Sequence, residues 1–292
     1  MRNTFIKELT ELARTNENIV LIVGDLGYSV IEEFQTAFPD RFYNAGIAEQ
    51  GMASMAAGLA SEGFHVFIYS IANFPTFRCA EQLRNDVGYH NLPVTVVTVG
   101  GGLSYGNLGY SHHAIQDLGL IRLFPEFEIL CPGDPYETKS CLSYIVNNPK
   151  PSYLRLKKAG EANYNLYAPD LKAGIWNKVV GSSNNRIFLT TSGGLHIAQE
   201  KVKTIHSFKD YGIYSLPIWG AGFKHLQQAQ LDQFEEVITV EDHLLDAGFG
   251  SWIRESITEL KSHLKIKHFA LNQNVIGKVG SEDYLLKVGG LV

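Results

Sequence analysis

The sequence has few cysteines and no long apolar run. Its three cysteines, Cys79, Cys131 and Cys141, are an odd number at spacings that match neither a disulfide framework nor a metal-binding knuckle. Reduced thiols packed in the core of a cytoplasmic protein are therefore expected. No apolar stretch approaches the roughly 20 residues of a membrane span. Residues 1–13 carry acids where a signal peptide needs an apolar run, so they are predicted to form an opening amphipathic helix.

The sequence also lacks an excess of positive charge and any low-complexity tract. A formal net charge of -5 gives no support to nucleic-acid binding. A hydrophobic fraction of 45% with 19% charged residues is typical of a soluble globular enzyme and argues against disorder. At 292 residues the chain is long enough for two domains of ordinary size.

Short apolar, β-branched runs alternate with helical stretches along the chain. Strands are predicted over 18–24, 64–69, 93–100, 127–132 and 152–156, and again over 186–194, 213–216 and 235–241. Helices are predicted over 31–38, 83–89, 197–208 and 251–264, and residues 160–185 read as a linker. This order predicts an α/β fold of two domains, 1–165 and 166–292, each a largely parallel sheet flanked by helices.

One carboxylate, Glu49, lies at the head of a helix that is otherwise small and apolar, from Gln50 to Ala60. Burying an acid is costly unless it is paired, hydrogen-bonded or protonated. The alternative is that Glu49 lies in the first turn, favoured by the helix dipole and partly solvated. Such an acid at a buried helix start is the first candidate functional residue.

The segment Asn44-Ala-Gly-Ile-Ala-Glu-Gln-Gly-Met52 resembles the G-I-x-E-x-x-M segment in the pyrimidine-binding domain of transketolase, a family of thiamine-diphosphate enzymes. The resemblance implies that Glu49 is catalytic, because the matching acid bonds the N1′ nitrogen of the aminopyrimidine and activates the cofactor. Ile47 is predicted to contact the cofactor as well. Asp25 is a further predicted cofactor contact, because it follows the first strand at the edge where parallel sheets bind ligands.

Residues 71–82 are similar to the aromatic segment that packs on the aminopyrimidine in this family. Phe74 falls on the principal stacking ring and Phe77 on a second aromatic, while Ile71 replaces a third. Stacking of this kind contributes about 0.5–1.5 kcal/mol beyond area burial. Without the family context, two phenylalanines three residues apart are more often core residues than a cofactor site, and Glu49 upstream at the expected distance supports the cofactor interpretation.

The glycine-rich segment 100–118 resembles the family's active-site loop, which ends in G-x-T-H-Q. His112 matches the substrate-facing histidine and His113 takes the position of the Gln; both are predicted to be catalytic, since imidazole can donate to an oxyanion or move a proton near neutral pH. Solvent exposure or a weak metal site is the alternative. Gly100 replaces another family histidine and Leu108 an acid that recognises a sugar hydroxyl, so a different hydroxyl selectivity is expected.

Three further residues match or lie near positions that hold the acceptor's phosphate in relatives. These predicted substrate-binding residues are Ser29, Arg155 and Lys158. The resemblance is compatible with a phosphorylated or nucleotide-linked acceptor and does not decide between them.

Thiamine-diphosphate enzymes hold magnesium and the diphosphate through a G-D-G motif followed by paired asparagines, whereas this chain has Gly24-Asp25-Leu26, and neither Asn147-Asn148 nor Asn184-Asn185 follows it at a useful distance. No metal ligand is predicted on this chain. A separate N-terminal diphosphate-binding subunit is predicted to hold Mg²⁺ and to share thiamine diphosphate in an α2β2 heterotetramer. Residues 240–252 resemble the V-E-x-H-x-x-x-G-G-x-G stretch of the transketolase C-terminal domain, with glycines expected at positive φ and a role in assembly.

The resemblance implies the C-terminal subunit of a split transketolase-like enzyme. It would move a two-carbon ketol unit to an aldehyde sugar, in specialised sugar biosynthesis. A 2-oxoacid dehydrogenase β subunit shares these two domains and is the first alternative. A non-catalytic regulatory or scaffold subunit is the second; Gly100 and Leu108 favour it slightly, whereas Glu49 and its aromatic neighbours argue against it.

Overall fold

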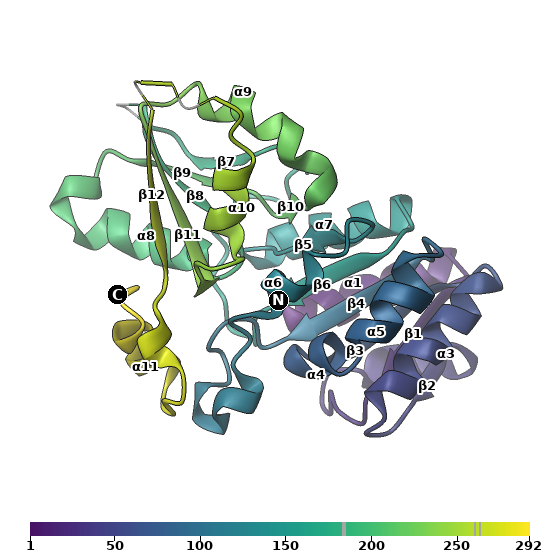
Figure 1. The fold of residues 1–292 in the computed structure, drawn as a ribbon. Helices are drawn as coiled ribbons and strands as arrows, with labels where there is room; N and C mark the ends of the chain where they lie inside the picture. The colour runs from purple at the N-terminus through teal and green to yellow at the C-terminus, as the bar shows by residue number, and fades with distance from the viewer. Residues whose placement is uncertain (183–184, 260, 263) are drawn as a thin grey trace.

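Two β-sheets organise the chain in the computed structural model, which describes residues 1–182, 185–259, 261–262 and 264–292 (Figure 1). The first sheet has the strand order β10-β5-β6-β4-β3-β1-β2. All of its pairs are parallel except β10 with β5. Its strands are β1 (Ile19–Val23), β2 (Phe42–Asn44), β3 (His65–Ile71), β4 (Val94–Val99), β5 (Glu128–Leu130), β6 (Ser152–Leu156) and β10 (Ile218–Trp219).

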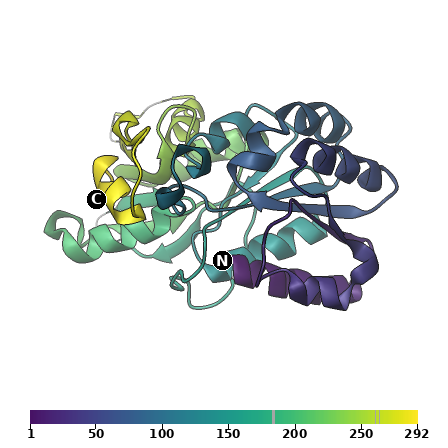
Figure 2. The same ribbon diagram turned by 90° about the horizontal axis from the view of Figure 1, so that it is seen from below.

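Helices cover both faces of the first sheet (Figure 2). Side chains of α1 and α7 pack with one set of strand residues, and those of α3 and α6 pack with the other set. The helices are α1 (Arg2–Thr15), α2 (Glu32–Ala37), α3 (Glu49–Ser61), α4 (Asn73–Phe77), α5 (Ala80–Gln82), α6 (Asp117–Ile121) and α7 (Pro135–Asn147), with a π-helical segment over Leu83–Gly88. The three cysteines are buried, as expected for core residues.

The second sheet has the order β12-β11-β8-β9-β7, and its pairs are parallel except β7 with β9. Its strands are β7 (Asn177–Val180), β8 (Arg186–Thr190), β9 (Gly212–Ser215), β11 (Glu236–Leu244) and β12 (Lys265–Leu271). The associated helices are α8 (Gly194–Thr204), α9 (Gln227–Leu231), α10 (Phe249–Glu255) and α11 (Glu282–Val288). The predicted α/β class with two largely parallel sheets is confirmed.

Several predicted boundaries differ from the structure. The helix expected over 251–264 ends at Glu255, and residues 260 and 263 of that prediction lie outside the described residues. Strand β7 lies inside the predicted linker; its residues alternate between half-buried and exposed, so it has no apolar run to mark it. Strand β10 lies after the predicted domain boundary at 165/166, yet it pairs with β5 of the first sheet. The position of the domain boundary therefore stays a prediction.

The glycine-rich segment after β11 is built around a buried acid. The carboxylate of Glu241 accepts hydrogen bonds from the backbone N–H groups of Phe249 at 2.6 Å and Gly250 at 2.7 Å, which satisfies the start of α10. A Cβ on Gly248 would stand 2.3 Å from this carboxylate. Ala247, not a glycine, takes the positive φ of 56°. Glycine is therefore required at position 248 because the backbone approaches Glu241 closely. This corrects the expectation that the glycines of this segment have positive φ.

The candidate residues lie mostly at one edge of the first sheet. Because β1, β3, β4 and β6 are parallel, their carboxyl ends meet at the same edge. Asp25 follows β1, α4 follows β3, the glycine-rich loop follows β4 and Lys158 follows β6. Among the described helices, none is long and apolar enough to cross a membrane.

Candidate active site

Glu49 begins α3 and is buried, with 4% of its surface exposed. The rest of that helix is small enough to pack closely on the sheet, and Met52, Ala53 and Ala56 are fully buried. The carboxylate accepts a hydrogen bond from Nη1 of Arg78 at 2.8 Å, while the arginine side chain is 54% exposed. Glu49 thus lies in the first turn of α3 and is paired with Arg78, and one side of the Arg78 side chain faces solvent.

Phe74 and His112 meet beside this ion pair. Their ring centroids lie 5.3 Å apart at an interplanar angle of 77°, an edge-to-face contact. The guanidinium carbon of Arg78 lies 5.2 Å from the centroid of Phe74. Glu49, Arg78, Phe74 and His112 therefore form a continuous row. Sequence reasoning missed Arg78, although its position one helical turn after Phe74 signals a shared face.

Ile47 lines a pocket with Glu49 and Arg78, and Phe77 is the last residue of α4; their exposed fractions are 76% and 45%. Both were predicted as cofactor contacts. A flat heterocycle bound beside the buried Glu49 would cover this exposed apolar surface.

His112 is held by its neighbours from two directions. Its Nδ1 lies 3.0 Å from the hydroxyl of Ser111. The amide of Asn73 donates to the carbonyls of Ser111 and His113 at 3.0 Å each, so it fixes the backbone on both sides of His112. Partial burial, followed by the charge of His113, lowers the pKa of His112, which favours the neutral imidazole near pH 7.

His113 does not face a substrate. It is 2% exposed, and its Nε2 lies 3.1 Å from the carbonyl of Gly106 within the same loop. The catalytic role of His113 stays a prediction, since in this structure the loop encloses the side chain. Its contact holds the loop together.

Arg155 is likewise not available to a phosphate. It is fully buried, and its N–H groups donate to Asp117 at 2.9 Å, to Ser192 and to Asp242 Oδ1 at 2.7 Å each, and to the carbonyls of Ala114 at 2.7 Å and Asp242 at 3.4 Å. These bonds use the five donors of a guanidinium. In this structure Arg155 ties β6 to the second sheet and has no donor left for a phosphate, and its phosphate role stays a prediction.

Asp25 and Ser29 lie in an exposed turn after β1. Asp25 accepts hydrogen bonds from Tyr28 and Asn44 at 3.1 Å each, and the N–H of Ser29 donates to Glu32 at 2.6 Å. Both residues have positive φ, 51° for Asp25 and 64° for Ser29. The turn is at the same sheet edge as Phe74 and His112, and its hydrogen bonds stay within the turn and its neighbour Asn44.

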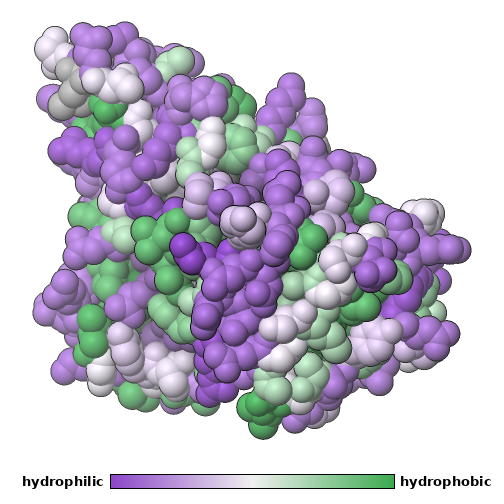
Figure 3. Space-filling model, turned by 45° about the vertical axis from the view of Figure 1, so that its right-hand side comes forward, coloured by the Kyte–Doolittle hydropathy of each residue, from purple (hydrophilic) through white to green (hydrophobic). Residues whose placement is uncertain are grey.

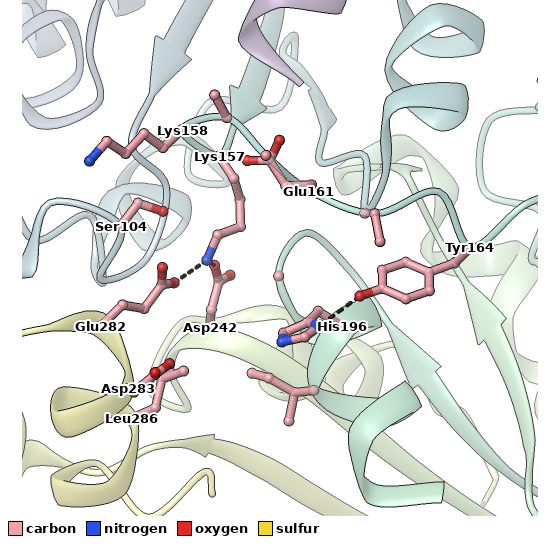
Figure 4. A pocket seen from close by; sticks show the side chains of 16 residues that line it. Ser104, Lys157, Lys158, Glu161, Tyr164, His196, Asp242, Glu282, Asp283 and Leu286 are labelled. Carbon is pink, nitrogen blue, oxygen red and sulfur yellow. Dashed lines mark hydrogen bonds and ion pairs between the residues drawn. The ribbon is translucent and has the colours of Figure 1, made fainter. Parts of the chain in front are cut away.

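Two consecutive lysines after β6 have different surroundings (Figure 4). Lys157 pairs with Glu282 and lies 3.6 Å from Asp242, inside a pocket of about 330 Å³ between β6, α8 and α11. Lys158 extends away from these acids, and its ammonium lies 5.5 Å from the ring centroid of Tyr105. In the described part of the chain Lys158 takes part in no ion pair, so it is the lysine that can meet an anion.

The residues present fit an aminopyrimidine but not a metal diphosphate. Glu49 is a buried acid beside Phe74, and Phe77 and Ile47 offer exposed apolar surface. Among the described residues, no group of three or more His, Cys, Asp or Glu side chains is placed to hold a metal ion.

Comparisons with known proteins identify the family to which the chain belongs. The model of the transketolase pyrimidine-binding domain matches residues 1–160. The chain is 32% identical to a putative transketolase C-terminal section of Methanocaldococcus jannaschii, covering 100% of this chain and 92% of that protein. It is 29% identical to one of the subunits of the apulose-4-phosphate transketolase of Phocaeicola vulgatus, covering 88% of this chain and 83% of that one.

A solved split-gene transketolase, described as an inactive beta4 tetramer, superimposes with a TM-score of 0.83 at 26% identity. The match covers 100% of this chain and 93% of that one. Together with the pyrimidine-domain match and the full-length similarity above, these observations show that the chain belongs to the transketolase family.

Proposed function

We propose that this protein is the C-terminal subunit of a split, thiamine-diphosphate-dependent transketolase that transfers a two-carbon ketol unit to an aldehyde sugar. The observation that carries the proposal is Glu49, which is buried at the start of α3 and lies in one row with Phe74 and His112. The full-length similarity to separate transketolase sections and subunits favours this function over a 2-oxoacid dehydrogenase β subunit.

When bound, the cofactor supplies the nucleophilic carbon that carries the two-carbon unit. The role of this chain would be to hold the pyrimidine ring of the cofactor and to supply protons to the ring and to the substrate. Glu49 would donate a proton to a ring nitrogen of the pyrimidine, in the nearly dry position that its 4% exposure provides. Phe74, Phe77 and Ile47 would cover the flat ring. His112, neutral at physiological pH because its pKa is lowered, would donate to the substrate oxygen on which charge develops.

On this proposal Arg78 competes with a pyrimidine for the carboxylate of Glu49. The two side chains pair directly at 2.8 Å, and a ring nitrogen would need the same carboxylate oxygen or its neighbour. Because the arginine is half exposed, it can turn toward solvent when the pyrimidine replaces it as the partner of Glu49. On this proposal Arg78 shields the acid while the site is open.

The partner subunit would supply the diphosphate and Mg²⁺ sites. The lack of a G-D-G motif in the sequence supports this, as does the description of the similar split-gene protein as an inactive tetramer of one chain type. Exposed apolar side chains lie next to the candidate site, and the face drawn in Figure 3 shows such side chains gathered in patches between polar ones. An α2β2 assembly would cover them. Asp25 and Ser29, in their exposed turn, remain proposed contacts to cofactor and acceptor.

The test is to express the chain with and without a transketolase N-terminal subunit that carries the G-D-G motif. Calorimetry should detect thiamine diphosphate binding, in Mg²⁺ buffer, by the pair and not by this chain alone. Glu49→Gln in the pair should lower ketol transfer by about 100-fold or more, because a general acid or base contributes at least that much. Binding by the isolated chain, full transfer by Glu49→Gln, or decarboxylation of 2-oxoacids in place of transfer would each contradict the proposal.

A further inference from the structure

The glycine-rich loop, residues 100–118, contacts the start of α11 through Gly106. A Cβ placed on Gly106 would stand 2.5 Å from the carbonyl oxygen of Gly280 and 2.5 Å from Cδ1 of Leu285, so the loop backbone lies directly against α11. The N–H of Gly280 donates to the carbonyl of Gly106 at 3.3 Å. Gly106 does not have a positive φ, so close packing, and not backbone conformation, requires glycine at this position.

The same carbonyl of Gly106 also anchors His113. Nε2 of His113 lies 3.1 Å from this oxygen, and the buried Nδ1 has no hydrogen-bond partner among the described residues. One carbonyl therefore joins the N–H of Gly280 to the imidazole of His113. Because His112 immediately precedes His113 in the chain, a displacement of Gly106 would also displace His112.

Apolar packing and an ion pair hold α11 in its place. Leu103 and Ile115, both within the glycine-rich loop, are fully buried in one hydrophobic cluster with Leu285 of α11. In the first turn of α11, Glu282 pairs with Lys157, which follows β6 of the first sheet (Figure 4). The loop and the strand that lies next to β4 in the first sheet are thus both attached to α11.

We propose that the start of α11, residues 280–285, is a positioning element for His112: joined to β6 by the Glu282–Lys157 pair, it fixes the glycine-rich loop through Gly106. The inference rests on the proposed function for the reaction that His112 serves. Contacts with Phe74 and Ser111 orient the His112 ring, whereas α11 holds the backbone of the loop. The C-terminal part of the chain would thereby contribute to catalysis without touching the substrate.

Two variants release the loop in different ways. Gly106→Ala introduces a Cβ for which the backbone of Gly280 leaves no room, and Glu282→Gln removes the ion pair with little change of shape. The first readout is an NMR titration of His112 in the full chain, its signal identified as the one missing from His112→Gln. Partial burial, followed by the charge of His113, lowers the pKa of His112 in the wild type. In both variants this pKa should rise toward the ordinary value of about 6.5, because a released loop exposes the ring.

The second readout is ketol transfer by the assembled two-subunit enzyme. Gly106→Ala should lower kcat by about tenfold with a smaller change in KM, because misplacement of a catalytic group affects the reacting geometry more than binding. Glu282→Gln should change kcat in the same direction by a smaller factor. A residue that only stabilised the fold would move neither the pKa of His112 nor the ratio of the two kinetic effects.

Matched controls are available in the chain. Gly222→Ala adds a Cβ to a glycine that has no atom within 4 Å of that position. Asp283→Asn removes the exposed carboxylate next to Glu282, which forms no ion pair with any residue that the structure describes. Neither control should change the pKa of His112 or kcat. Circular dichroism establishes that each variant is folded, and Glu282→Gln, which alters a half-buried side chain, keeps the test available if Gly106→Ala does not fold.

The NMR titration needs neither the partner subunit nor turnover, so it separates the two proposals. If the pKa of His112 rises in the variants while the assembled wild type transfers nothing, the positioning role is supported and the proposed function is contradicted. If the wild type transfers ketol units and the folded variants match it in both readouts, the function is supported and the positioning role is overturned.

Discussion

Glu49 and Arg78 form an ion pair of unequal exposure: 2.8 Å joins their charged atoms, yet the acid is 4% exposed and the arginine 54%. The pair explains how a buried carboxylate is tolerated when no cofactor is present. It also makes the stability of this region depend on a side chain that solvent can reach.

Removing Arg78 should therefore destabilise the chain. Arg78→Ala leaves the carboxylate of Glu49 buried without its partner, at an expected cost of about 1–3 kcal/mol. Urea unfolding of the purified chain measures this cost. In the double variant Glu49→Gln/Arg78→Ala most of the loss should be recovered, because no charge is left unpaired. Arg84→Ala, an exposed arginine in the adjacent π-helical segment, serves as the control and should change stability little.

His65 should make stability fall in mild acid. Burial lowers the pKa of His65 from 6.5 to about 4, and its Nε2 lies 3.1 Å from the hydroxyl of Thr95. The unfolded chain binds a proton below pH 6.5, but the folded chain does so only near pH 4. The contribution of neutral, buried His65 to the free energy of unfolding is thus fully present above pH 6.5. It is lost as the pH falls toward 4, by roughly 3 kcal/mol in total.

Unfolding free energies measured from pH 4 to 7.5 check this prediction. His65→Gln should flatten the dependence, whereas the exposed His206→Gln should leave it as in the wild type. An unchanged slope in His65→Gln would mean that other groups cause the acid sensitivity.

Substitution of Arg155 tests whether this residue binds the phosphate of a substrate or stabilises the fold. Its partners Asp117 and Asp242 are as buried as it is, so Arg155→Met removes the pairing cation from Asp117 and leaves Asp242 only the more distant Lys157, at 3.6 Å. Breaking a buried pair in this way costs about 3–5 kcal/mol. Thermal unfolding should show a large loss, or the variant should be insoluble, while Arg14→Ala on exposed surface should not. A stable Arg155→Met chain with weakened sugar-phosphate binding would restore the phosphate role.

The strands and the site edge were predictable from sequence, whereas the buried charges were not. Uniformly apolar runs such as Ile19–Val23 are buried on both faces and have few other interpretations. Parallel strands bring their carboxyl ends together, which places Phe74 near His112. Arg155, in contrast, matched a ligand position in the family, but its environment is set by Asp242, 87 residues further along the chain. Local sequence carries no information on such a partner.

The different surroundings of His112 and His113 could not be predicted for the same reason, because they depend on contacts that the local sequence does not show. Two adjacent histidines look equivalent in sequence, but the loop turns one outward against Phe74 and encloses the other against the carbonyl of Gly106. The N–H of Gly280, just before α11, also bonds that carbonyl at 3.3 Å, and Figure 1 shows the loop beside α11. The C-terminal segment thus contacts the active-site loop, a contact that the predicted role in assembly did not include.

Asn73 should position His112 through its two amide hydrogens. Both donate to backbone carbonyls, those of Ser111 and His113 at 3.0 Å each, and its own carbonyl oxygen is buried with no hydrogen-bond partner among the described residues. Asn73→Ala frees the loop and should lower kcat for transfer by about tenfold with a smaller change in KM, because misplacement of a catalytic group affects the reacting geometry more than binding. Asn73→Asp keeps the shape but sets a carboxylate against two carbonyl oxygens, so it should be worse than Asn73→Ala. If Asn73 only filled space, the order would be reversed, since Asp is the closer match in volume. The comparison of kcat for the two variants in the assembled enzyme therefore decides whether the amide hydrogens or the volume of Asn73 hold His112 in place.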